Sequence, residues 1–106
     1  MLAPAPAPAP LGALLDQGRL AEARGQVLPA RELYEHALQS LPSNTPAWTI
    51  ARLLVGVGRT HLATRNPDAA LDCVEAVLGL PDEPGMQVEL AEALELRGRV
   101  RTREGQ

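Results

Sequence analysis

The sequence predicts an all-α protein, and its composition is the first reason. Leu and Ala together make up about a third of the 106 residues, and both are strong helix formers. Val and Ile are too few and too scattered to form the alternating apolar runs that strands require. The chain has no Phe and only one Trp and one Tyr, so its core must consist mainly of Leu and Ala. Small Ala side chains let helices pack closely, which favours stacked helices.

A repeated motif is the second reason. Leu-x-x-x-Gly-Arg occurs three times at a constant spacing, with copies that begin at Leu14, Leu54 and Leu94. A fixed period of about 40 residues is typical of stacked repeat units. We therefore expect an Ala/Pro-rich tail followed by one helical repeat domain. The expected ranges are 1–10 for the tail, 11–106 for the domain, and about 11–44, 45–83 and 84–106 for two repeats and a half repeat.

The N-terminal segment, residues 1–10, alternates Ala and Pro. This pattern favours polyproline II, an extended conformation without internal hydrogen bonds. It lacks the basic residues and helical apolar core of a signal peptide. We therefore expect a tail with no fold of its own.

The first unit reads as a helix hairpin. A helix over residues 11–24 is followed by a turn at residues 25–27, and Pro29 then suits the first turn of a second helix. Leu33, Tyr34, Ala37, Leu38 and Leu41 form the apolar stripe of that helix, and Pro42 ends the unit.

The second unit repeats this plan. Thr45 is a candidate N-cap for a helix that runs to about Thr64, and Asn66 is a candidate N-cap for the next helix, with Pro67 in its first position. Leu71, Val74, Val77 and Leu78 form the apolar stripe of that helix.

The third unit has a single helix, from Met86 to about Arg103, and no partner helix follows it in the sequence. We expect its outer face to be solvated and to carry Glu89, Glu92, Glu95, Arg99 and Arg103.

This pattern resembles the tetratricopeptide repeat family, in a variant whose period is about 40 residues instead of about 34. Besides the period, His61 departs from the Tyr that is common at its position, and the third unit is only half a repeat. The residues that carry the resemblance are Gly18, Ala30, Tyr34, Ala37, Leu38 and Pro42 in the first unit, and Trp48, Gly58, Ala70, Leu71, Leu78 and Pro81 in the second.

The resemblance implies a short right-handed solenoid whose concave groove is lined by the first helix of each unit. In this family such a groove binds a peptide or a helical segment of another protein. The Arg of each motif copy would face the groove, where three guanidinium groups could bind carboxylates. The alternative is that each Arg lies near the end of its helix and stabilises the last carbonyls or pairs with a local Glu. The candidate partner-binding residues are Arg19, Arg59, Arg99, Leu15, Arg52 and Leu62.

Composition argues against several other classes of function. The net charge is −3, there is no Lys, and no basic stripe suggests a nucleic-acid partner. Neither His has a Cys or His neighbour at metal-ligand spacing, and no catalytic constellation or cofactor motif occurs. No apolar run reaches the roughly 18 residues that span a bilayer. Cys73, the only Cys, suits a reducing cytoplasm, and the exclusive use of Arg suggests a GC-rich bacterial genome.

The leading hypothesis is therefore a cytoplasmic interaction module or adaptor, not an enzyme, that binds no cofactor and no metal. One alternative is the N-terminal sensor or scaffold region of a larger bacterial signalling or transcription-regulatory protein. A third hypothesis, a helical nucleic-acid binder, would use the four Arg residues between 97 and 103. The unpaired last helix also allows a homodimer.

Overall fold

The computed structural model describes residues 11–104, which form five α-helices and no strand. The predicted all-α class is confirmed for this part of the chain, and the Ala/Pro tail lies outside the described residues. The helices are α1 (Leu11–Ala23), α2 (Val27–Gln39), α3 (Ala47–Ala63), α4 (Pro67–Leu78) and α5 (Gln87–Glu104).

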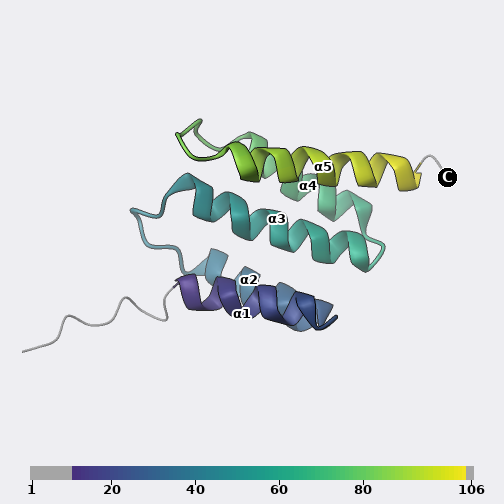
Figure 1. Ribbon diagram of the computed structural model, residues 1–106, viewed down its shortest axis with the longest axis horizontal. Helices are drawn as coiled ribbons and strands as arrows, with labels where there is room; N and C mark the ends of the chain where they lie inside the picture. The colour runs from purple at the N-terminus through teal and green to yellow at the C-terminus, as the bar shows by residue number, and fades with distance from the viewer. Residues whose placement is uncertain (1–10, 105–106) are drawn as a thin grey trace, which may run out of the picture.

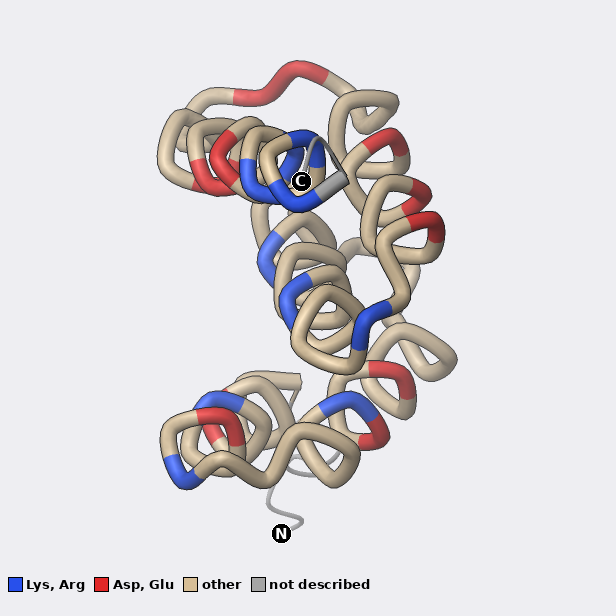
Figure 2. Tube along the Cα trace, turned by 90° about the vertical axis from the view of Figure 1, so that its right-hand side faces the viewer, with Lys and Arg blue, Asp and Glu red and all other residues tan. Residues whose placement is uncertain are grey.

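The helices form two layers. Figure 1 shows α1, α3 and α5 running in the same direction across one face, with α2 and α4 behind them. Figure 2, turned by 90°, shows that the five helices follow a curved arc. Helix α3 lies at its centre and contacts each of the other four helices. Helix α4 starts one motif period after α2, and α5 starts one motif period after α3.

The two helix hairpins turn in the same way. Gly25, after α1, has a positive φ of 76°, and Arg65, the residue one period later, has a φ of 61° after α3. A residue in this left-handed conformation commonly ends a helix, because it lets backbone N–H groups reach the last carbonyls. The N–H of Gln26 donates to Ala21, and the N–H of Asn66 makes the equivalent bond to His61. The turn geometry therefore follows the period of the sequence.

The predicted caps had different outcomes. Asn66 caps α4 as expected, since its side chain accepts a hydrogen bond from the N–H of Ala69 at 3.5 Å. The prediction for Thr45 was wrong, because Pro46 occupies the N-cap of α3 and the Thr45 hydroxyl donates instead to the Pro42 carbonyl at 2.6 Å.

Residues distant in the sequence fix both ends of α3. The Glu83 carboxylate, from the segment before α5, accepts a hydrogen bond from the first N–H of α3 at 3.0 Å. At the other end, Arg31 donates to the Thr60 carbonyl at 2.8 Å and Arg103 to the Leu62 carbonyl at 3.1 Å. The Ala47 N–H has no partner within the helix, whereas the Thr60 and Leu62 carbonyls also accept backbone N–H groups of the turn after α3.

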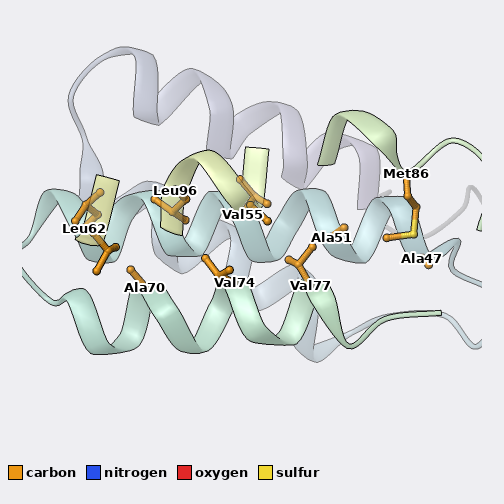
Figure 3. Packing of buried hydrophobic residues seen from close by; sticks show 11 residues of the cluster. Ala47, Ala51, Val55, Leu62, Ala70, Val74, Val77, Met86 and Leu96 are labelled. Carbon is orange, nitrogen blue, oxygen red and sulfur yellow. The ribbon is translucent and has the colours of Figure 1, made fainter. Parts of the chain in front are cut away.

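The core has two parts, one on each side of α3. In the first, Ala70, Val74 and Val77 of α4 point toward α3 and α5 (Figure 3). In the second, Tyr34 of α2 is completely buried among residues of α1 and α3. Small and medium side chains predominate in both parts, as the composition predicts.

Two glycines make room for Tyr34. A Cβ atom on Gly56 of α3 would lie 2.7 Å from Cε2 of the Tyr34 ring, and a Cβ on Gly18 of α1 would overlap the other edge of the same ring. Real Cβ atoms do not approach a ring so closely, so both positions require Gly. Because a glycine contacts each edge, the ring cannot move away from one without pressing on the other. Tyr34 therefore sets how α1 and α3 approach each other.

We predict that Gly56→Ala destabilises the protein. The overlap with the Tyr34 ring should cost about 1–3 kcal/mol, which exceeds the gain of up to about 1 kcal/mol from helix propensity. Gly98→Ala is the matched control, since a Cβ there meets no atom within 4 Å and only the propensity gain remains. Urea unfolding of the two variants should therefore shift in opposite directions, and equal shifts would contradict this role for Tyr34.

Candidate functional site

An open cleft lies on the face formed by α1, α3 and α5. It encloses about 280 Å³ and is lined by two residues of each of these helices. The two residues are four positions apart on α1 and α5 and seven apart on α3, spacings that place both on one side of a helix. The lining residues are Leu15 and Arg19 of α1, Arg52 and Arg59 of α3, and Val88 and Glu92 of α5.

Arg59 joins the three helices that line the cleft. Its Nη2 and Nε donate to the two carboxylate oxygens of Glu22, on α1, at 2.8 and 3.0 Å. Its Nη1 lies 3.4 Å from the carboxylate of Glu92, on α5. Such a forked contact fixes both position and orientation. Arg59 therefore links α1 and α5 across α3 and is already paired with carboxylates of its own chain.

Tyr34 connects this ion pair to the core. Its hydroxyl donates to Glu22 Oε1 at 2.5 Å, so Glu22 binds Arg59 and Tyr34 at once. Burial raises the pKa of Tyr34, and the Glu22 hydrogen bond raises it further. Burial also acts to raise the pKa of Glu22, but the Arg59 and Tyr34 hydrogen bonds outweigh it, so the pKa of Glu22 is lowered. The Glu22 hydrogen bond raises the pKa of Arg59 against the opposing effect of burial.

Arg52 is held by a different pair of contacts. Its Nη2 and Nε donate to Glu89 Oε2 at 3.1 and 3.3 Å, and its guanidinium lies 4.8 Å from the centre of the Trp48 ring. The expectation that Glu89 lies on a solvated outer face was wrong, because Glu89 is only 1% exposed. Arg52 compensates its charge, which explains how a carboxylate remains buried between α3 and α5. Removing Arg52 would leave the Glu89 carboxylate buried without its charged partner.

The three arginines of the repeated motif have different environments. Arg19 is exposed in the cleft and forms no ion pair with the described side chains, which include residues 11–103. Arg59 is paired with Glu22 and Glu92, and Arg99 forms an exposed contact of 3.1 Å with Glu95 on its own helix. Arg99 lies outside the cleft, in a neighbouring hollow that it shares with Arg59 and Glu92. The structure thus brings Arg19, Arg52 and Arg59 into one cleft.

Of the two candidate apolar residues, Leu15 lines the cleft and Leu62 does not. Leu62 is 4% exposed and belongs to the core between α3, α4 and α5. A partner in the cleft would not reach its side chain, so we correct its assignment from binding residue to core residue. Leu62 was assigned to the groove by family resemblance, but the period of about 40 residues, longer than the usual 34, changes that register.

Two cleft residues, Val88 and Glu92, were not among the predicted binding residues. The period could have identified Glu92, because it lies one period after Arg52 and should share the orientation of that residue on the next first helix. The repeat period could not have identified Glu22, because the residues one and two periods later, Leu62 and Thr102, are not acidic. Its partner Arg59 is also 37 residues away in sequence.

Reactive or metal-binding groups do not gather at the cleft. Among the described residues, no three His, Cys, Asp or Glu side chains form a cluster able to hold a metal ion. Cys73 of α4 packs at the edge of the core, where burial raises its pKa to about 11 and keeps the thiol protonated near neutral pH. Burial, with a smaller effect from Arg31, lowers the pKa of His61, whose Nδ1 has no hydrogen-bond partner among the described residues.

Comparisons with known proteins return no relative. No protein-family model matches the chain, and neither the curated proteins nor the solved structures that were searched contain a match. None of the helices in the described residues is long and apolar enough to cross a membrane.

We predict that Glu22→Gln destabilises the fold by about 1–3 kcal/mol near neutral pH, because it removes a charged hydrogen-bond acceptor. The folded-state pKa of Glu22 lies below its usual value of 4.5, so its stabilising effect is present above that pH and is lost as the pH falls through the folded-state value. The difference in melting temperature between the wild type and the variant should therefore be largest near pH 7 and shrink below about pH 4.5.

Glu32→Gln is the control for this experiment, since Glu32 is an exposed residue of α2. It should change the melting temperature little at any pH. A difference between the wild type and Glu22→Gln that stays constant from neutral to acidic pH would show that Glu22 is not held as a paired carboxylate.

Proposed function

We propose that this protein is an interaction module, of a tetratricopeptide-like type, that binds an acidic peptide or helical segment of a partner protein in the cleft. Arg19, Arg52 and Arg59 line one cleft that also contains apolar side chains, and this arrangement supports the proposal. Guanidinium groups bind carboxylates through paired N–H donors, which gives both affinity and orientation.

The guanidinium groups still have donors for a partner. Arg19 makes no ion pair with the described side chains and offers all its N–H groups. Arg52 uses Nε and Nη2 for Glu89, which leaves Nη1 free of that contact. Arg59 uses all three of its nitrogens for Glu22 and Glu92 and serves to position the helices. A partner carboxylate would therefore bind chiefly to Arg19, and next to Arg52.

Apolar contacts complement this charged part of the cleft. Val88 is 62% exposed at the edge of the cleft, and Trp48, stacked on Arg52, is 36% exposed. Trp is enriched among the residues that dominate binding at protein interfaces, and Val88 adds exposed apolar surface beside it. The proposed ligand therefore combines a carboxylate with an apolar side chain on the same short segment.

We predict that Arg19→Glu abolishes binding of ligands selected for the cleft, because it replaces the available donor with a repelling charge. A random peptide library displayed on phage and selected on the wild-type protein should enrich sequences with Asp or Glu beside a large apolar residue. Binding of each selected peptide can be measured by the fluorescence of Trp48, the only Trp of the chain, which stacks on a cleft residue.

Arg24→Glu is the matched control, since it makes the same charge change at an exposed residue just after α1 that does not line the cleft. The selected peptides should bind this variant as well as the wild type, and their affinity should fall with increasing salt. Peptides without acidic residues, or equal binding to both variants, would overturn the proposed role of the cleft.

A further inference from the structure

One face of α3 packs against α4, and α5 carries the same residue types on the equivalent face. On α3, this face contains Gly58, where an added Cβ would lie 3.3 Å from Cβ of Cys73 on α4 and 2.6 Å from Cδ2 of Leu96 on α5. The face is covered along its length. Positions one period later carry the same residue types, and the three matching pairs are Ala51 and Ala91, Leu54 and Leu94, and Gly58 and Gly98.

On α5 the same face is uncovered. Leu94 is 44% exposed, Ala91 is exposed, and a Cβ on Gly98 would meet no atom within 4 Å. On α3, by contrast, Ala51 is 0% exposed and Leu54 packs against the core. The described residues contain no helix that covers α5 as α4 covers α3.

The exposed face suits a single helix and no further layer. On α3, Val55 and Leu62 lie beside this face and are buried in the core that α5 helps to close. The equivalent residues of α5 are Glu95 and Thr102, which are polar and exposed. Helix α5 therefore keeps the small and apolar residues that on α3 contact the second helix of the unit. At the positions that on α3 face the next unit, α5 has polar residues instead.

The charge along one edge of this face indicates what kind of helix could bind there. Arg97 and Arg101 lie three and seven residues after Leu94, on the same side of α5, and form no ion pair with the described side chains of residues 11–103. A second copy whose α5 packed antiparallel on this face about a two-fold axis would bring four such guanidinium groups together along this edge. A helix with carboxylates at the corresponding positions would instead be attracted to it.

We propose that the face of α5 formed by Ala91, Leu94 and Gly98 is a docking site for one amphipathic helix of a partner protein. The helix packs antiparallel on α5, as α4 packs on α3, and places carboxylates beside Arg97 and Arg101. The absence of a side chain at Gly98 allows close approach, and Leu94 supplies the apolar contact. This surface is separate from the cleft and does not depend on the function proposed for it.

A peptide with the sequence of α4 and its flanking residues, 66–80, is the probe. It carries the surface that packs on α3, with Ala70, Val74 and Val77. Asp72 and Glu75 are exposed and lie on the other side of the peptide helix, so this probe tests the apolar contact. Titrated into the full chain labelled with ¹⁵N, it should shift the amide signals of Ala91, Leu94 and Gly98. Leu94→Glu should weaken its binding at least about 10-fold, because it puts an unpaired charge into an apolar contact.

Matched controls separate the docking site from general effects. Leu20→Glu makes the same change at an apolar residue of α1 that is 51% exposed, and it should leave binding unchanged. A second peptide with Glu in place of Ala69, which lies at the edge of the packing surface, should bind more tightly than the first, and Arg101→Gln should remove that gain. Arg19→Glu should have no effect here, which distinguishes failure of this site from failure of the cleft.

Two results would overturn the proposal. The first is that the α4 peptide, at millimolar concentration, leaves the amide signals of the α5 face unchanged or binds Leu94→Glu as well as the wild type. The second is a dimer in sedimentation velocity that Leu94→Glu dissociates, because the face would then be occupied by a second copy of the chain.

Discussion

The packing of one Tyr ring between two glycines determines how the first two helical units meet. Tyr34 of α2 lies between Gly18 of α1 and Gly56 of α3, and any larger residue at either glycine would overlap its ring. Complete burial removes the ring from water, which would leave its hydroxyl unsatisfied without a partner. The Glu22 carboxylate supplies that partner. The same carboxylate binds Arg59, so a steric constraint in the core also fixes a charged group in the cleft.

The cleft is consequently part of the packing between helices. Arg59 joins α1, α3 and α5 through two carboxylates, and Arg52 holds the buried Glu89 while it stacks on Trp48. These arginines stabilise the arrangement of the first helices and at the same time line the surface that we propose as a binding site. Charge reversal at Arg59 or Arg52 would therefore disturb the fold as well as the cleft. Arg19, which the described side chains leave unpaired, is the position where binding can be changed with least effect on packing.

Patterns among residues close in sequence were enough to predict the helices, but they were not enough to predict the contacts of the cleft residues. The helix class, the position of each helix and the Asn66 cap follow from residues close in sequence, such as Pro67 next to Asn66. Glu89, by contrast, was placed on the solvated face of α5 because its partner Arg52 is 37 residues away and no local pattern reveals that pairing. Leu62 was misplaced because the family register does not carry over to a longer period. The repeat period did identify residues that occupy equivalent positions on different helices, such as Gly58 on α3 and Gly98 on α5.

Core packing and cleft charge are coupled through Glu22, and a double-mutant cycle between Tyr34→Phe and Arg59→Gln measures this coupling. Each substitution removes one group bound to Glu22 without adding bulk. Urea unfolding of the wild type, both single variants and the double variant gives the coupling free energy. We expect a coupling free energy of about 0.5–3 kcal/mol, as found for residues in one hydrogen-bond network. Additive effects, with a coupling near zero, would show that Glu22 does not connect the core to the cleft.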